Sequence, residues 1–151
     1  MRYPKLQQYF DKGEIEELLA DCEDAFATID NYKNDFIGDM ITTSDEYKKA
    51  LNVLTGIYMF FEPIFSLAQA YKEIKEDEAY CNIRTEAETA GKKLTADALK
   101  VEAHKSVSMF IRVRNIFESY VNAADKGIIT CQTQLKRIEE IKTYKPTEER
   151  K

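Results

Sequence analysis

Residues 110–138 read FIRVRNIFESYVNAADKGIITCQTQLKRI, and their apolar side chains recur every three or four positions. The recurring positions are Phe110, Val113, Phe117, Tyr120, Ala124, Ile128, Cys131, Leu135 and Ile138. This spacing places all of them along one side of an α-helix, as in a heptad repeat. The pattern continues past Gly127, so either one long helix passes through this glycine or two helices meet there in line.

Two segments upstream show the same periodicity. The first predicts a helix over residues 14–37, which Gly13 precedes and Gly38 follows as the expected C′ residue. The second begins after Thr43, where Thr43-Ser44-Asp45-Glu46 is typical of a capping box, and extends to about residue 90. Pro63 falls inside it, and we expect a kink or a restart near Glu62 because proline lacks the N–H that a helix needs.

The stop and start signals after residue 90 are also local. Gly91 ends one helix and Thr95 caps the next, with Asp97 in its first turn. The sequence therefore predicts an all-α protein, an elongated helical hairpin or bundle of four to five helices, two of them long. We expect one domain over residues 1–143 and a flexible tail over residues 144–151.

Apolar side chains lie on more than one helix face, at Phe60-Phe61, Ile64-Phe65 and Ile128-Ile129. A thin bundle would bury them poorly on its own, so we expect a homo-oligomer. The predicted interface is the stripe Phe110, Val113, Phe117, Tyr120, Ile128, Cys131, Leu135 and Ile138.

Charge divides the chain into two halves. Residues 1–90 hold 9 Lys and Arg against 19 Asp and Glu, a net charge of −10, whereas residues 91–151 hold 13 against 8, a net charge of +5. Such asymmetry points to nucleic acid or to association of opposite surfaces. The three cysteines are widely spaced and predict reduced thiols in a cytoplasmic protein. Glu62 and Pro63 interrupt the most apolar stretch, residues 50–71, so no membrane span is expected.

The patterns that carry catalysis or metal binding are missing from this sequence. His104 follows Glu102 by two positions, which puts the two side chains on different sides of a helix. Glu73 and Glu76 share a face, but no facing acidic pair accompanies them, so they are interpreted as solvated surface. We therefore expect neither an enzyme nor a metal or other cofactor.

Basic residues cluster between positions 92 and 114: Lys92, Lys93, Lys100, Lys105, Arg112 and Arg114. On one continuous helix Lys105 and Arg112 would share a face, and a basic stripe of this kind can follow a phosphate backbone. Tyr71, Tyr80 and Tyr120 are candidate surfaces on which bases could stack. The alternative is an ordinary solvated helix face paired with the acidic half.

Residues 68–142 resemble the C-terminal half of the UvsY-type phage recombination mediators. The resemblance rests on the Leu94-Thr95 cap, the segment Leu99-Lys100-Val101, and a helix that ends Asp125-Lys126-Gly127, with Gln134 and Arg137 in the helix after it. Arg84 and Gly91 have counterparts in related small phage proteins. The family's DNA-binding stretch corresponds to Ile74-Lys75-Glu76-Asp77, where Lys75 fits but an acid replaces the family's Arg.

The resemblance implies an oligomeric accessory protein that binds single-stranded DNA and helps to load a RecA-like recombinase, displacing a single-strand-binding protein. The cytoplasm of an infected bacterium would be its location. Candidate DNA contacts are Lys75, Lys92, Lys93, Lys100, Lys105, Arg112 and Arg114. Two other classes stay open: a small phage protein that inhibits a host defence or enzyme through its acidic surface, and a structural component of a helical assembly.

Overall fold

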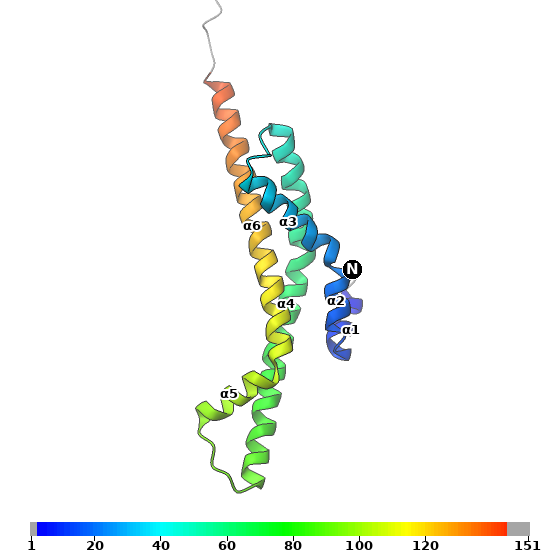
Figure 1. Cartoon of the computed structure of the whole chain (residues 1–151), viewed down its shortest axis with the longest axis vertical. Helices are drawn as coiled ribbons and strands as arrows, with labels where there is room; N and C mark the ends of the chain where they lie inside the picture. The colour runs from blue at the N-terminus through cyan, green and yellow to red at the C-terminus, as the bar shows by residue number, and fades with distance from the viewer. Residues whose placement is uncertain (1–2, 145–151) are drawn as a thin grey trace, which may run out of the picture. The chain divides into compact units, whose positions relative to one another are not determined.

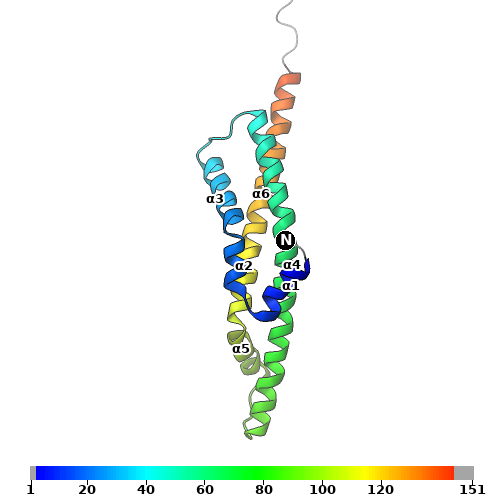
Figure 2. The ribbon, with the colours of Figure 1, turned by 90° about the vertical axis from the view of Figure 1, so that its right-hand side faces the viewer.

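The computed structural model describes residues 3–144, and every regular element in that range is an α-helix (Figures 1 and 2). The helices are α1 (Tyr3–Lys12), α2 (Ile15–Asp21), α3 (Glu23–Ile37), α4 (Ser44–Thr89), α5 (Ala96–Ser106) and α6 (Ser108–Thr143). The predictions of an all-α bundle and of two long helices are confirmed. Residues 145–151, most of the predicted tail, lie outside the described residues.

Six helices form where four to five were predicted. One reason is α1, which was not predicted from the sequence. In addition, the expected helix over residues 14–37 divides at Cys22 into α2 and α3, and the helix expected after Thr95 divides at Val107 into α5 and α6. Gly38 does not adopt a left-handed conformation after α3; instead Asp39 does so, at φ 51°.

Pro63 neither ends nor restarts α4, which is one helix from Ser44 to Thr89. Proline removes the N–H that would bond to the Met59 carbonyl four residues earlier. Met59 and Pro63 are both exposed, so water can reach this carbonyl. The helix therefore continues without leaving a buried polar group unsatisfied.

Helix α4 begins at the predicted capping box. The Thr43 hydroxyl accepts from the Glu46 N–H at 3.3 Å, and Glu46 Oε2 accepts from the N–H groups of Thr42 and Thr43 at 3.0 and 2.9 Å. These backbone donors lower the pKa of the Glu46 carboxyl, because they stabilise its charged form.

The predicted break between residues 91 and 95 is also confirmed. Gly91 has φ +69°, and the N–H groups of Gly91 and Lys92 bond to the carbonyls of Glu88 and Ala87, which is the Schellman arrangement. Thr95 then caps α5, because its hydroxyl accepts from the Ala98 N–H at 3.2 Å.

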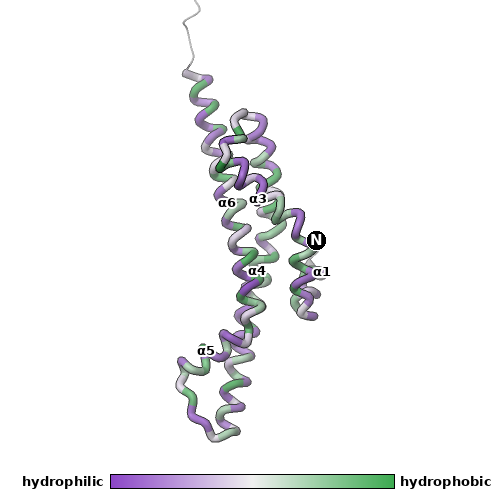
Figure 3. Tube along the Cα trace, viewed as in Figure 1, coloured by the Kyte–Doolittle hydropathy of each residue, from purple (hydrophilic) through white to green (hydrophobic). Residues whose placement is uncertain are grey.

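The chain divides into two compact units, and the long helices α4 and α6 contribute to both. One unit contains residues 1–19 and 62–119, and the other contains residues 20–61 and 120–151. The division does not follow the change of charge at residue 90. Apolar and polar residues alternate along the helices of each unit, as amphipathic helices require (Figure 3).

Each unit has its own core. Buried residues of the first unit include Leu6, Phe10, Ile15, Leu18, Ile64, Val113 and Phe117. Those of the second include Cys22, Phe26, Ile29, Leu54, Phe61, Ala124 and Cys131. Burial, together with the nearby charge of Asp21, raises the pKa of the Cys22 thiol to about 11, so this thiol stays protonated and unreactive.

Helix α6 passes through Gly127 unbroken, and the reason is a close approach in the second unit. A Cβ on Gly127 would lie 2.7 Å from Leu54 Cδ1 and 3.6 Å from Phe36 Cε2. Leu54 is buried, so its methyl group has little room to move. Packing therefore favours glycine at this position, although it is a poor helix former.

Gly127→Ala should destabilise the protein. The alanine gains about 1 kcal/mol of helix propensity, but overpacking a filled site costs about 1–3 kcal/mol, so a net loss of about 1 kcal/mol is expected. Urea unfolding of Gly127→Ala, Leu54→Val and the double variant measures this. Because Val is smaller, the two changes together should cost less than their sum. A strictly additive pair would contradict the close packing of Leu54 on Gly127.

Thr95→Ala should lower the free energy of unfolding by about 1 kcal/mol, because the Ala98 N–H loses its capping oxygen. Thr130→Ala is the matched control. The Thr130 hydroxyl bonds within α6 to the Lys126 carbonyl, where alanine is at least as good a helix former. Equal losses in the two variants would show that Thr95 does not act as a cap.

Candidate nucleic-acid interface

A groove of about 420 Å³ lies in the first unit, where α4 ends and α5 begins. The loop that connects these two helices is visible in Figure 1. Three basic side chains and one aromatic ring line the groove, together with small or apolar residues and one carboxylate. The lining residues are Tyr80, Arg84, Ala87, Glu88, Lys92, Lys93, Leu94, Ala96 and Leu99.

Local sequence rules build this groove. Tyr80 and Arg84 are four residues apart on α4 and therefore share a helix face. The turn at Gly91 reverses the chain, so Lys92 and Lys93 come back beside that face. The Thr95 cap then starts α5, whose Leu99 is buried and forms part of the groove wall.

The positive side chains in the groove differ in whether a carboxylate already pairs with them. Arg84 Nε donates to Glu88 Oε1 at 2.9 Å, and this contact raises the pKa of the guanidinium. Lys92 and Lys93 are exposed and form no ion pair within residues 3–144. The two lysines are therefore the most available cations for an anionic ligand.

The other predicted DNA-contacting residues do not gather in the groove. Lys100 is exposed on α5, one residue past Leu99. Lys75 pairs with Glu78 and Lys105 with Glu102, each at 2.8 Å on its own helix. Arg112 lies 3.6 Å from Glu16, beside a different hollow that Ile15, Leu19 and Met109 also line.

The expected common face for Lys105 and Arg112 does not form. Helix α5 ends at Ser106, its C-cap Val107 has a ψ of 20° that departs from the helical value, and α6 begins at Ser108. The two basic residues therefore belong to different helices. Val107 is buried, so its apolar contacts stabilise the break between α5 and α6. The sequence pattern did not predict this break.

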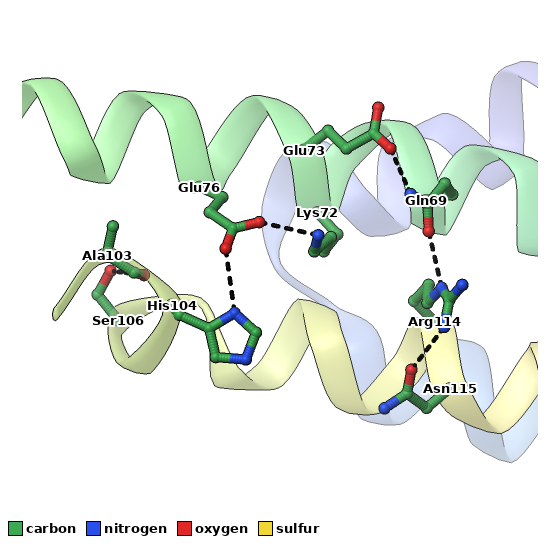
Figure 4. A network of polar contacts seen from close by, with 9 residues as sticks. All are labelled: Gln69, Lys72, Glu73, Glu76, Ala103, His104, Ser106, Arg114 and Asn115. Atoms are coloured by element: carbon green, nitrogen blue, oxygen red, sulfur yellow. Dashed lines mark hydrogen bonds and ion pairs between the residues drawn. The ribbon is translucent and has the colours of Figure 1, made fainter. Parts of the chain in front are cut away.

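Arg114 serves the fold and is largely withdrawn from solvent. Its guanidinium donates to Gln69 Oε1 at 2.7 Å, to Asn115 at 2.9 Å and to both oxygens of Glu118, and it lies 5.5 Å from the Phe65 ring centre. Figure 4 shows the Gln69 contact, which connects α6 to α4, and the Asn115 contact, which lies within α6. An arginine engaged at every nitrogen is a poor candidate for a phosphate contact.

Of the three tyrosines proposed as stacking surfaces, only Tyr80 lines the groove. Tyr71 stacks on Phe10 with ring centres 5.0 Å apart and donates to Asp11. Tyr120 donates to Asp30 at 2.9 Å and packs on Phe26, and burial followed by that hydrogen bond raises the pKa of its hydroxyl. The place of Arg84 in the groove was not predicted, although its spacing of four from Tyr80 was a usable signal.

The predicted oligomer stripe on α6 is divided by burial. Val113, Phe117 and Cys131 are completely enclosed within the chain itself, so they have no surface to offer a second copy. The remaining members are half-buried: Phe110, Tyr120, Ile128, Leu135 and Ile138. In the structure the heptad pattern therefore serves the intramolecular core first.

His104 connects α5 to α4. Its Nδ1 lies 3.0 Å from Glu76 Oε1, while Lys72 Nζ lies 2.8 Å from Glu76 Oε2 (Figure 4). The contacts from Lys72 and then His104 lower the pKa of the Glu76 carboxyl. Within residues 3–144 no group of three His, Cys, Asp or Glu side chains is arranged to hold a metal ion.

Comparisons of the chain with protein-family models, with curated proteins and with solved structures found no match.

The lowered pKa of Glu76 predicts a pH dependence for its contribution to stability. Because the folded pKa lies below the ordinary value of 4.5, the contribution is present above that value and is lost as the pH falls through the lowered one. The difference in unfolding free energy between the wild type and Glu76→Gln should therefore shrink under acidic conditions. Urea titrations across a pH series measure this difference. Lys72→Gln should show the same trend, and a difference independent of pH would contradict it.

Proposed function

We propose that this protein binds single-stranded DNA through the groove at the end of α4 and acts as a recombination accessory protein. The observation that supports the proposal is the grouping of Arg84, Lys92 and Lys93 around the Tyr80 ring. Cations that follow a phosphate backbone beside an aromatic ring that stacks on a base are the usual elements of single-strand recognition. Lys100 would extend the basic surface along α5.

Binding in this groove is moderate and sensitive to salt. Glu88 lies in the groove and Glu86 and Asp97 are close in sequence, so the local charge is only weakly positive. To bind a phosphate, Arg84 must give up part of its hydrogen bonding and ion pairing with Glu88. The logarithm of the binding constant is expected to fall linearly with the logarithm of the salt concentration. For single strands the slope is about −0.7 for each phosphate contact.

The mediator role rests on the resemblance of residues 68–142 to the UvsY-type proteins and goes one step further than DNA binding. In that role the protein would hold the strand while a RecA-like recombinase replaces a single-strand-binding protein. The function needs no catalytic group in this chain, because loading depends on differences in binding free energy.

A second candidate function is binding to a basic surface of another protein, including inhibition of a host enzyme. Helices α2 and α3 favour it, because residues 13–32 contain no Lys or Arg, while Glu16, Glu17, Glu23 and Asp24 are all exposed. Such a surface would repel DNA and attract a cationic partner.

Changing Arg84, Lys92, Lys93 and Lys100 to Ala should weaken binding of a labelled oligo-dT strand and flatten the salt slope by up to about 0.7 for each phosphate that is no longer neutralised. Fluorescence anisotropy over a salt series gives both quantities. The matched control changes four exposed lysines outside the groove, Lys33, Lys49, Lys126 and Lys136. Tyr80→Ala should cost about 1–3 kcal/mol of binding, whereas Tyr80→Phe retains the ring and should bind like the wild type.

The outcomes separate the two candidates. If the wild type does not bind the strand even at low salt, the DNA proposal fails and the acidic surface becomes the leading candidate. Equal weakening by the control lysines would indicate diffuse electrostatic attraction with no groove. A stimulation assay with a RecA-like recombinase on strands coated by single-strand-binding protein then tests the mediator role by itself.

A further inference from the structure

Helix α4 has an apolar face that the rest of the chain does not cover. Between Lys49 and Lys72 the helix has a single charged residue, Glu62. By length and composition this stretch is apolar enough to cross a membrane, yet only 28% of its most apolar 18-residue window is buried. Exposed apolar surface of this kind usually marks an interaction site.

The centre of this uncovered region is a small group of side chains, which we call the α4 face: Asn52, Val53, Gly56, Met59 and Phe60. Their spacing of three or four places them on one side of the helix. Met59 is 70% exposed, and Val53 and Phe60 are half-exposed. A Cβ on Gly56 would meet nothing within 4 Å, so the backbone itself is open to contact there.

The charges that border this face have opposite signs at its two ends, because the exposed Lys48 and Lys49 lie at one end and Glu62 lies at the other. Lys48 precedes Thr55 by seven residues, and Glu62 follows it by seven. Residues seven apart occupy nearly the same angular position on a helix, so these three lie along one edge of the face. Lys48 is only 3.9 Å from Asp45 and both are exposed, while Glu62 accepts a hydrogen bond from Ser66 at 3.1 Å.

We infer that the α4 face binds a second copy of this chain, with the two α4 helices antiparallel about a two-fold axis beside Thr55 and Gly56. A two-fold axis at that point places Lys48 of each copy opposite Glu62 of the other, because the two residues are equidistant from it. Gly56 beside the axis lets the two backbones approach closely, and Met59 and Phe60 fill the contact on either side.

A second copy fits this face better than a lipid surface does. Glu62 stands at the edge of the apolar face and would be repelled by anionic headgroups or desolvated by acyl chains. A self-associating pair instead neutralises Glu62 with Lys48 twice, once on each side of the axis. The inference is independent of DNA binding, because none of these residues lines the groove.

Charge reversal tests the pairing. Lys48→Glu and Glu62→Lys should each weaken the dimer about tenfold or more, because each places two like-charged pairs in the interface. The double variant should recover wild-type affinity, and a mixture of the two single variants should form a heterodimer. Analytical ultracentrifugation measures all four samples. Lys136→Glu, an exposed lysine on α6, is the control for net charge.

Two apolar changes test the contact itself. Met59→Glu should abolish the dimer, whereas Met40→Glu should not, although Met40 is exposed to the same extent at 69%. Gly56→Leu adds apolar surface, so nonspecific association would become stronger, but a close crossing at this glycine would be blocked. Circular dichroism and urea unfolding verify that each variant folds.

Several results would overturn the inference. They are a monomeric wild type at high micromolar concentration, a dimer that tolerates Met59→Glu, or a tighter dimer in Gly56→Leu. Failure of the double charge reversal to restore affinity would reject the antiparallel pairing. Co-sedimentation of the wild type, but not of Met59→Glu, with phosphatidylcholine vesicles would assign the face to lipid instead.

Discussion

The close approach of α4 and α6 at Leu54 and Gly127 is the constraint on which the second unit depends. Leu54 Cδ1 occupies the space that a Cβ at Gly127 would need, so the glycine lets the two helices approach closely at this point. The aromatic contacts of Phe26 with Phe61 and with Tyr120, at ring-centre distances of 5.0 and 4.4 Å, belong to the same unit. In the first unit, the contact of Gln69 with Arg114 plays the comparable role between the same two helices, with a hydrogen bond in place of a packed methyl group.

The groove exists because the backbone N–H and C=O groups at a helix end have no hydrogen-bond partners within the helix. The last carbonyls of α4 are taken up by the Gly91 and Lys92 N–H groups, and the first N–H groups of α5 need the Thr95 hydroxyl. These two requirements hold the chain between residues 91 and 95 outside any helix and leave its lysines exposed. Capping contacts therefore hold a binding surface at this position, and no core residue has to be exposed to form it.

The elements predicted correctly from sequence are those that local rules determine. The capping box at Thr43–Glu46 and the Gly91–Thr95 break involve residues within a few positions of one another, so their pattern is visible in the chain. The features that the sequence left open or missed depend on partners distant in sequence. Whether Gly127 is a break depends on Leu54, the availability of Arg114 depends on Gln69, and the end of α5 depends on the burial of Val107. For the same reason the sequence identified the lysines of the candidate site but not their grouping with Tyr80 and Arg84.

The two surfaces of α4 explain why so apolar a helix is compatible with a chain that is 32% charged. Leu54, Phe61 and Ile64 are buried on its inner side. Its outer side has Gly56, Met59 and Pro63, all of which are exposed. Pro63 is informative here, because a proline weakens the helix and is tolerated only where the freed Met59 carbonyl finds a donor. Met59 and Pro63 are both exposed, so water can reach that carbonyl, and a partner on this face must leave it solvated or supply a donor of its own.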